Sequence, residues 1–389
     1  MFITFSFVLL FAQPVRLAPA DPIADKLVSE ALQKTPELDA ARAALEAARR
    51  RVEPARTLPD PMASFSYQTD ERGVMLSQPL PWPGKLNLEA RATASEAREL
   101  EVGPLNRAAL TIEARVRTAW YDLALARALD GLIEERRETA TQIEATTRDR
   151  YAAGLAVQQD VLRAQVELAR IDELKSEQRA AIASRLAELN RLLGRPQDAI
   201  LDTATELPAI APLPAIADVV EGILALSPEV AAARQGIETG KLRIDIAKKN
   251  FRPDFVISAG SMRSMWQIGA GVSLPVWINK RQQNQLAEAR AQLAEQTADT
   301  DVVARELELR TRERIAQLES ANDVATLYRE KVIPLDELSY ESALASYQSG
   351  KVPFITVFDA MNSLYSDRAN YLGRLAEAAK WRVAIDEAR

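Results

Sequence analysis

The pattern of hydrophobic and polar positions predicts two very long helical stretches, each followed by a second long helix. Residues 86–153 and 281–348 are almost continuously compatible with a helix, and only Gly103-Pro104 and Pro334 interrupt them. At about 1.5 Å per residue, each stretch extends to about 100 Å. The return helices carry apolar side chains at multiples of about seven residues, a spacing typical of coiled-coil seams. These positions are Val161, Leu168, Ile182 and Leu189 in the first return helix, and Val357, Leu364, Tyr371, Ala378 and Ile385 in the second.

A period of two residues predicts two β-hairpins, at 61–80 and 254–275, each ahead of a long helical stretch. In the second hairpin, residues 266–274 alternate apolar side chains with glycine, glutamine and serine, as a strand facing lipid on one side and water on the other would. A membrane-spanning strand needs about 9–11 residues. The strands of the second hairpin barely reach this length, and those of the first, 63–68 and 74–80, fall below it.

The same order of elements occurs twice along the chain. Thr-Pro-Glu-Leu at 35–38 recurs as Ser-Pro-Glu-Val at 227–230, and Tyr-x-x-Gly at 151–154 recurs at 347–350, about 192–196 positions later. The chain is therefore a tandem duplication, and we expect its two mostly helical halves to share one core. The expected organisation is a first repeat over 21–194, a proline-rich linker over 195–215 and a second repeat over 216–389, with helical-hairpin tips at 151–158 and 347–354.

The N-terminus has the character of a secretion signal. Residues 3–11 are apolar, and Ala18-Pro19-Ala20 precedes the polar Asp21, as at a cleavage site between small residues. We therefore expect a signal peptide over 1–20 and export of the protein; the alternative is a buried structural segment. Beyond this point no apolar run approaches the roughly 20 residues of a spanning helix, so any membrane crossing has to use strands.

Composition removes most kinds of chemistry. The chain has 0 cysteine and 0 histidine residues, which excludes thiol nucleophiles, disulfides, zinc sites with nitrogen or sulfur ligands and histidine general bases. Carboxylate chemistry would need two acids in a dry cleft, whereas the acids here are spread along helical surfaces. We therefore expect no enzyme, no catalytic residue, no cofactor and no metal site. The net charge is only −6 and no basic cluster is interleaved with aromatic residues, so no nucleic-acid partner is expected.

Three segments resemble one known family. They are Ser77-Gln78-Pro79-Leu80-Pro81-Trp82-Pro83-Gly84-Lys85 after the first hairpin, and the tips Tyr151-Ala-Ala-Gly154-Leu155 and Tyr347-Gln-Ser-Gly350-Lys351. Together with the duplicated order of elements, they make the chain resemble the TolC-like outer membrane efflux protein family. The first segment is similar to members that serve heavy-metal and cation efflux pumps. The resemblance implies a mainly α fold with a small β part: a homotrimer whose very long coiled-coil helices form a trimeric α-barrel in the periplasm, below a shortened 12-stranded β-barrel in the bacterial outer membrane.

The resemblance also implies a function. Such a trimer is the outer-membrane channel of a tripartite efflux system, a passive exit duct for small solutes or metal cations. It receives them from an inner-membrane pump of the RND type through a periplasmic adaptor, or membrane fusion, protein. The residues agree, because two hairpins per chain leave strand edges unpaired in outer-membrane lipid and three chains would have to pool them. The short hairpins keep two alternatives open: an incomplete barrel at the inner leaflet, and a non-conducting periplasmic coiled-coil scaffold.

One group of candidate residues concerns a pore gate. By the resemblance, Asp359 occupies the position of one ring of carboxylates that closes the tunnel, and Thr356 occupies the other. Three Asp359 carboxylates in a narrow neck would repel one another and attract cations; the alternative is a solvated carboxylate near a helix N-terminus. Asp160 corresponds to a residue that pairs with a base on the other tip. Val352 occupies the expected partner position, so Lys351 is the substitute partner, and the alternative for Asp160 is a helix N-cap.

The tips and the hairpin ends carry the remaining candidates. Gly154 and Gly350 are expected to take backbone angles that other residues resist, which lets two helices reverse within a few residues. Trp82 and Trp277 follow the hairpins at equivalent places, where an amphipathic ring suits the membrane–water boundary; packing against the helix layer is the alternative. By the resemblance, the tips dock the adaptor through Tyr151, Gly154, Leu155, Tyr347, Gly350 and Val352.

Overall fold

The computed structural model describes residues 17–68, 71–201, 207–262 and 265–389, so most of the expected signal peptide lies outside the described residues. Contacts divide the chain into two units. The first contains Leu110–Ile223, Glu308–Arg389 and the segment that ends at Thr35. The second contains Pro36–Ala109 and Leu224–Leu307. Each unit therefore takes segments from both halves of the chain.

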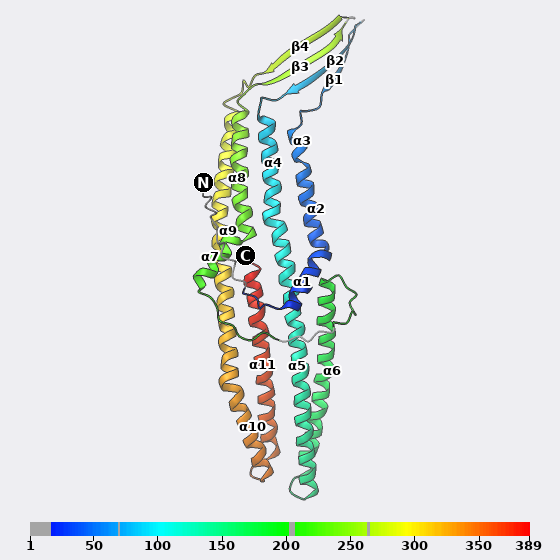
Figure 1. Ribbon diagram of the computed structural model, residues 1–389, viewed down its shortest axis with the longest axis vertical. Helices are drawn as coiled ribbons and strands as arrows, with labels where there is room; N and C mark the ends of the chain where they lie inside the picture. Colours follow the sequence, from blue (N-terminus) through cyan, green and yellow to red (C-terminus); the bar gives the residue numbers. More distant parts are fainter. Residues whose placement is uncertain (1–16, 69–70, 202–206, 263–264) are drawn as a thin grey trace, which may run out of the picture. The chain divides into compact units, whose positions relative to one another are not determined.

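The first unit consists of helices, most of them long (Figure 1). They are α1 (Pro22–Lys34), α5 (Asn106–Ala152), α6 (Gln158–Leu192), α7 (Ile216–Leu226), α9 (Gln282–Leu327), α10 (Ile333–Gln348) and α11 (Phe354–Asp386), of which α5, α7 and α9 extend into the second unit. α1 begins where the Asp21 carboxylate accepts hydrogen bonds from the backbone N–H groups of Ile23 and Ala24. Pro22 suits the first position of a helix, because the backbone N–H that proline lacks would have no acceptor within the helix there.

The core of the first unit follows the apolar stripes of its helices. In α11, four of the five predicted seam residues are at most 5% exposed, and only Tyr371 is half-buried. In α6, only Leu189 of the predicted seam is buried, and Ala164 and Ile171 are buried instead, each three residues after a predicted position. A heptad offers two core positions, and the sequence reasoning marked only one of them.

Neither predicted interruption ends a helix. The chain passes Gly103-Pro104 in a π-helical turn, η1 (Glu101–Leu105), and reaches Pro334 directly after a second one, η2 (Tyr328–Val332). A π turn holds one extra residue, which makes room for a proline ring and for its missing N–H within an otherwise continuous helix. The two long stretches are therefore unbroken runs of helical turns with a bulge near each proline.

The second unit joins helices to one antiparallel sheet. Its helices are α2 (Pro36–Arg50), α3 (Val52–Arg56), α4 (Lys85–Leu100) and α8 (Pro228–Lys249). Its strands are β1 (Met62–Gln68), β2 (Glu71–Leu80), β3 (Asp254–Met262) and β4 (Met265–Ser273), in the order β1-β2-β3-β4. The two hairpins thus pair into a single sheet through β2 and β3. No helix in the described ranges has both the length and the apolar character of a membrane span.

The predicted length of β2 is wrong. β2 contains 10 residues, because pairing with β1 continues through Ser66↔Gly73 and Tyr67↔Arg72, before the predicted start of the strand at residue 74. The Arg72 side chain is exposed, so its charge does not oppose the strand. β3 and β4 contain 9 residues each and β1 contains 7. Only β1 therefore falls below the length of about 9–11 residues that spans a membrane.

Candidate functional site

The sheet presents two different faces. Phe65, Val74, Ser261 and Trp266 lie opposite one another on β1, β2, β3 and β4, and alternation along each strand assigns every other residue to a face. One face is mostly apolar, with Arg72, Gln78 and Ser261 as its polar members. Its apolar side chains are 50% to 87% exposed at Phe65, Tyr67, Val74, Leu76, Ile257, Trp266, Ile268 and Val272. The opposite face carries mostly small or polar residues, among them Ser64, Ser66, Ser77, Ser258, Gln267, Gly269, Gly271 and Ser273. Such a sheet suits the boundary between an apolar medium and water.

The two outer edges of this sheet have no strand partner within the described residues. β2 lies between β1 and β3, and β3 lies between β2 and β4, so the described sheet ends at β1 and at β4 (Figure 1). An edge strand presents a row of unpaired backbone N–H and C=O groups. In an apolar medium such groups would have no water to bind.

The two tryptophans that follow the hairpins have different surroundings. The Trp82 ring stacks on Phe255 with ring centroids 5.8 Å apart, and its backbone N–H donates to the Asp254 carboxylate at 2.8 Å. The Arg252 guanidinium lies 5.8 Å from the centroid of the same ring. Trp82 therefore packs against the start of β3, whereas Trp277 is 67% exposed. Trp277 has the better position for an interfacial ring.

Both helical-hairpin tips use the same backbone geometry. Gly154 has φ +73° and Gly350 has φ +74°, in the left-handed region that side chains with a Cβ resist. The N–H of Leu155 donates to the carbonyl of Arg150 at 2.8 Å, and the N–H of Lys351 donates to the carbonyl of Ser346 at 2.9 Å. These bonds end α5 and α10 in the manner of glycine-capped helices, so the next helix can begin within a few residues.

The side chains of the two tips differ. In the first tip Tyr151 is 46% and Leu155 66% exposed, whereas Tyr347 of the second tip is 3% exposed. The Tyr347 ring meets Phe354 edge-on, with centroids 5.8 Å apart. Tyr347 therefore belongs to the core of the tips and offers no surface to a partner, contrary to its expected role. Val352 is half-buried, packed against the same core.

Arg150 joins the two tips, and sequence reasoning missed it. Its guanidinium donates to the backbone carbonyl of Gln348 in the other tip and to that of Leu155 at 3.2 Å. It also lies 4.9 Å from the centroid of the Tyr347 ring, a cation–π distance. A comparison of the two repeats could have drawn attention to Arg150, because the corresponding position of the second tip is Ser346.

The expected gate residues are not brought together within this chain. Asp359 and Thr356 are exposed, one turn apart on α11. The N-cap of α6 is Val157, so Asp160 lies in the first turn and is not the cap. Within the described part of the chain, Asp160 forms no ion pair with Lys351, whose side chain is exposed. A gate of these residues therefore depends on contacts with other copies.

A pair of carboxyl groups lies further along the same helices. Desolvation, followed by a hydrogen bond with Asp367, raises the pKa of Asp336 above its ordinary value. Asp336 follows Pro334 in the first turn of α10, and Asp367 is on α11. Nearby, Arg368 donates to Glu337 at 2.6 Å. The Asp336 and Asp367 carboxyls share a proton more readily than two separate acids would. Because Asp336 and Asp367 lie far apart in the sequence, the sequence pattern did not predict that they would be neighbours.

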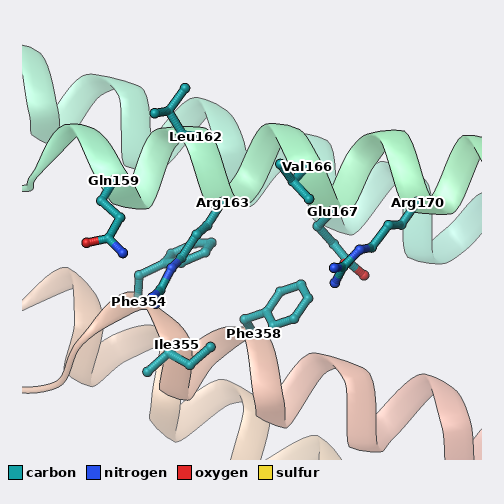
Figure 2. A pocket seen from close by; sticks show the side chains of 9 residues that line it. All are labelled: Gln159, Leu162, Arg163, Val166, Glu167, Arg170, Phe354, Ile355 and Phe358. Atoms are coloured by element: carbon teal, nitrogen blue, oxygen red, sulfur yellow. The ribbon is translucent and has the colours of Figure 1, made fainter.

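A cavity of about 340 Å³ lies between α6 and α11 near the tips (Figure 2). Phe354 and Phe358 extend from α11, with ring centroids 6.4 Å apart, and Arg163 and Arg170 extend from α6 beside them (Figure 2). Glu167 in the same wall is buried and accepts a hydrogen bond from Arg136 at 2.5 Å. Neither Arg163 nor Arg170 forms an ion pair with a described residue. We call this cavity the tip groove; it combines an apolar floor with two cations.

Metal binding is the remaining kind of site to examine in the structure. Within the residues that the structure describes, no group of three or more aspartate or glutamate side chains is placed to hold a metal ion. The candidate surfaces are therefore the two-faced sheet, the tips, the tip groove and the exposed Asp359.

Comparison with known proteins identifies the family. A family model described as outer membrane efflux protein matches residues 27–195 and 219–388. The cobalt-zinc-cadmium resistance protein CzcC of Cupriavidus metallidurans is 25% identical over 362 residues, which cover 90% of this chain and 85% of that protein. This match therefore extends over most of both chains.

Solved structures share the fold. The outer membrane protein VceC of Vibrio cholerae has a TM-score of 0.77 at 21% identity, covering 95% of this chain and 96% of that one. CusC has a TM-score of 0.79 at 18% identity, covering 99% of this chain and 96% of that one. These structures confirm the expected fold class. The family model confirms the expected efflux function and outer-membrane localisation. Because the family model covers both halves of the sequence, the chain belongs to the outer membrane efflux protein family.

Proposed function

We propose that this chain forms, as a homotrimer, the passive exit duct of a tripartite efflux system. It receives solute from an inner-membrane pump of the RND type through a periplasmic adaptor, and it carries out no chemistry itself. The observation that carries this proposal is the sheet, with one exposed apolar face and two open edges. Those edges make a single copy unfit for lipid, because an unpaired backbone group there costs several kcal/mol.

Three copies resolve the open edges. If β4 of one copy pairs with β1 of the next, three sheets of four strands close into one sheet of twelve, 3 × 4. All apolar faces then point outward to lipid and all polar faces inward to water. Closure removes every edge at once.

Exposed apolar residues on the helices support the same assembly. Leu174 of α6, which lies outside the tip groove, is exposed, and so are Leu309 of α9 and Leu335 and Leu338 of α10. Two different surfaces are uncovered, and contact between one surface and the other on a neighbouring copy generates a ring. Burying them removes apolar area that a lone chain would leave in water.

The tips and the tip groove are the proposed docking surface for the adaptor. Leu155 and Val157 are exposed at the first tip, and the tip groove next to them offers Phe358 with Arg163 and Arg170. This combination fits a helical segment with apolar residues on one side and carboxylates beside them. Exchanging Arg163 and Arg170 for glutamine is expected to weaken adaptor binding without dissolving the trimer.

Metal cations are the cargo we propose. CzcC is named as a cobalt-zinc-cadmium resistance protein, and in the trimer three Asp359 carboxylates would favour cations. With 0 histidine and 0 cysteine residues, the duct offers soft metals no strong ligands, so a cation would pass without being held. Selection of the metal then belongs to the pump.

The rival is a scaffold that spans the periplasm without conducting. Purified protein in planar bilayers separates the two functions. A duct gives discrete conductance steps that depend on the protein, whereas a complete absence of openings at every voltage and pH would leave the scaffold. Membrane insertion is tested with Ile268→Lys on the apolar face, because a lysine there costs about 2–4 kcal/mol at the bilayer midplane. Gln267→Lys on the opposite face is the matched control and is expected to insert normally.

A further inference from the structure

Residues directly before α1 are part of the folded chain. Leu17 and Ala18 are buried. The backbone N–H of Leu17 donates to one carboxylate oxygen of Asp386 at 3.1 Å, and that of Ala18 donates to the other at 2.7 Å. Asp386 is the last residue of α11, and its side chain is only 12% exposed. Both oxygens of this largely buried carboxylate are thus satisfied by the N-terminal segment.

Arg382, one turn earlier on α11, holds the same segment from its other side. Its guanidinium donates to the backbone carbonyl of Leu17 at 3.5 Å. It also donates to the backbone carbonyl of Ala211, which lies in the linker over 195–215. Arg382 is 6% exposed, and burial lowers the pKa of its guanidinium. A cation in such a place depends on its few hydrogen-bond partners. Leu17 is one of them.

The segment continues into the cap of α1. Asp21 accepts hydrogen bonds from the N–H groups of Ile23 and Ala24, and its second oxygen accepts one from the Trp120 indole N–H at 2.7 Å. Cleavage before Asp21 would place a new α-ammonium group at the start of α1. The N-terminus of a helix carries a partial positive charge, so an added cation there is unfavourable.

We propose that Leu17–Ala20 remain in the mature protein as an N-terminal strap that ties the start of α1 to the end of α11 and to Ala211. Where a leader is removed by hydrolysis of a peptide bond, the cut lies before Leu17 and not after Ala20. Removal of residues 1–20 would take both N–H donors from the Asp386 carboxylate, leaving Arg389 at 3.9 Å, and would take the Leu17 carbonyl from the Arg382 guanidinium, leaving Ala211. Each largely buried charge would then have fewer partners than it needs. The small-residue pattern Ala18-Pro19-Ala20 therefore belongs to the fold.

The first test is the N-terminus of the native protein. Protein purified from its own cell envelope is analysed by intact mass and by N-terminal sequencing. The expected first residue is Leu17 or one that precedes it. A mature chain that begins at Asp21 would overturn the proposal, whatever the conductance of the protein, so this result is independent of the duct function.

The second test asks whether Asp386 acts through the strap. Two chains are secreted behind the same foreign leader, one beginning at Leu17 and the other at Asp21, and each is combined with Asp386→Asn. The variant is expected to lower the melting temperature of the Leu17 chain by about 2–4 °C and to leave the Asp21 chain nearly unchanged. Failure of only the Asp21 chain to fold would also support the strap. Equal shifts in both chains would refute it.

The matched control is Glu377→Gln, a carboxylate on the same helix whose partner is Arg374 at 2.7 Å. Its side chain is 38% exposed, and it lies outside the strap contacts. Glu377→Gln is expected to change the melting temperatures of both chains equally and only slightly. A strap-dependent shift for Glu377→Gln would show that the comparison reports helix stability in general, which would overturn the assignment of the Asp386 effect to the strap.

Discussion

Substitution of Arg150 tests whether the link between the two tips keeps the duct closed. Arg150→Met keeps most of the aliphatic stem but removes the hydrogen bonds to the carbonyls of Gln348 and Leu155 and the contact with the Tyr347 ring. Each hydrogen bond contributes about 0.5–1.5 kcal/mol in a partly exposed place. The cation–π contact adds about 0.5–1 kcal/mol.

The bond to Leu155 lies within the first tip, so only the bond to Gln348 and the contact with the Tyr347 ring are lost when the tips separate, together roughly 1–2.5 kcal/mol per chain. Since 1.4 kcal/mol corresponds to a factor of ten, the ratio of open to closed tips rises by about 5- to 60-fold at most. The assay is single-channel recording in planar bilayers, where Arg150→Met is expected to raise the open probability at low voltage. Native gels establish that the trimer is intact.

Arg148→Met is the matched control for this experiment. Arg148 lies on the same helix, but it donates only to Glu144 one turn away at 2.6 Å and is largely exposed. This pair stays within one helix and does not reach the other tip, so its loss leaves the link between the tips unchanged. Channels with Arg148→Met are expected to behave as wild type. Wild-type opening of Arg150→Met, in an intact trimer, would refute the idea that this link holds the tips together.

Three further predictions concern the same region. Asp359→Asn is expected to lower the preference of the open duct for cations over anions, measured as a shift in reversal potential across a salt gradient; an unchanged potential would remove Asp359 from the pore. The native pKa of Asp336 lies above its unfolded value, so its contribution to stability is fully present below the unfolded pKa and is lost as pH rises from there through the native pKa. Asp336→Asn should therefore raise the melting temperature at pH 7 and reduce the gain on acidification, and an identical pH profile in wild type and variant would contradict the sharing of a proton with Asp367. Gly154→Val and Gly350→Val each force a β-branched residue to positive φ, which costs about 1–2 kcal/mol; trimers should persist while efflux-dependent resistance falls, and loss of the trimers would assign both glycines to folding alone.

The helical part of the fold could be predicted because its signals are local. A glycine at the end of each long helix, proline positions that tolerate a bulge and a seven-residue apolar spacing are all visible in neighbouring residues. The confirmed fold class and family rest on these signals and on their repetition. The start of β2 escaped prediction, because Glu71, Arg72 and Gly73 have turn propensity and only pairing with β1 makes them a strand.

The candidate site was less predictable, because identical motifs acquired different surroundings. Tyr151 and Tyr347 occupy the same place in the repeated Tyr-x-x-Gly pattern, yet only Tyr347 is buried. The cause is Phe354, which meets its ring, whereas the corresponding position of the first repeat is the polar Gln158. Similarly, Asp336 and Asp367 become neighbours only when α10 and α11 fold back on each other.

The two repeats differ in charge at the level of the proposed gate. At an offset of about 196 positions, Arg163 of the first repeat stands where the second has Asp359, and Asp160 stands where the second has Thr356. In the proposed trimer, only the second repeat then supplies a carboxylate ring at the level of Asp359, so three carboxylates face the cations and not six. Arg163 lies in the tip groove instead, where a cation beside Phe358 suits an acidic partner. On the proposed function, the two equivalent helical hairpins therefore differ in charge at one position, and this difference separates the proposed docking surface from the proposed pore.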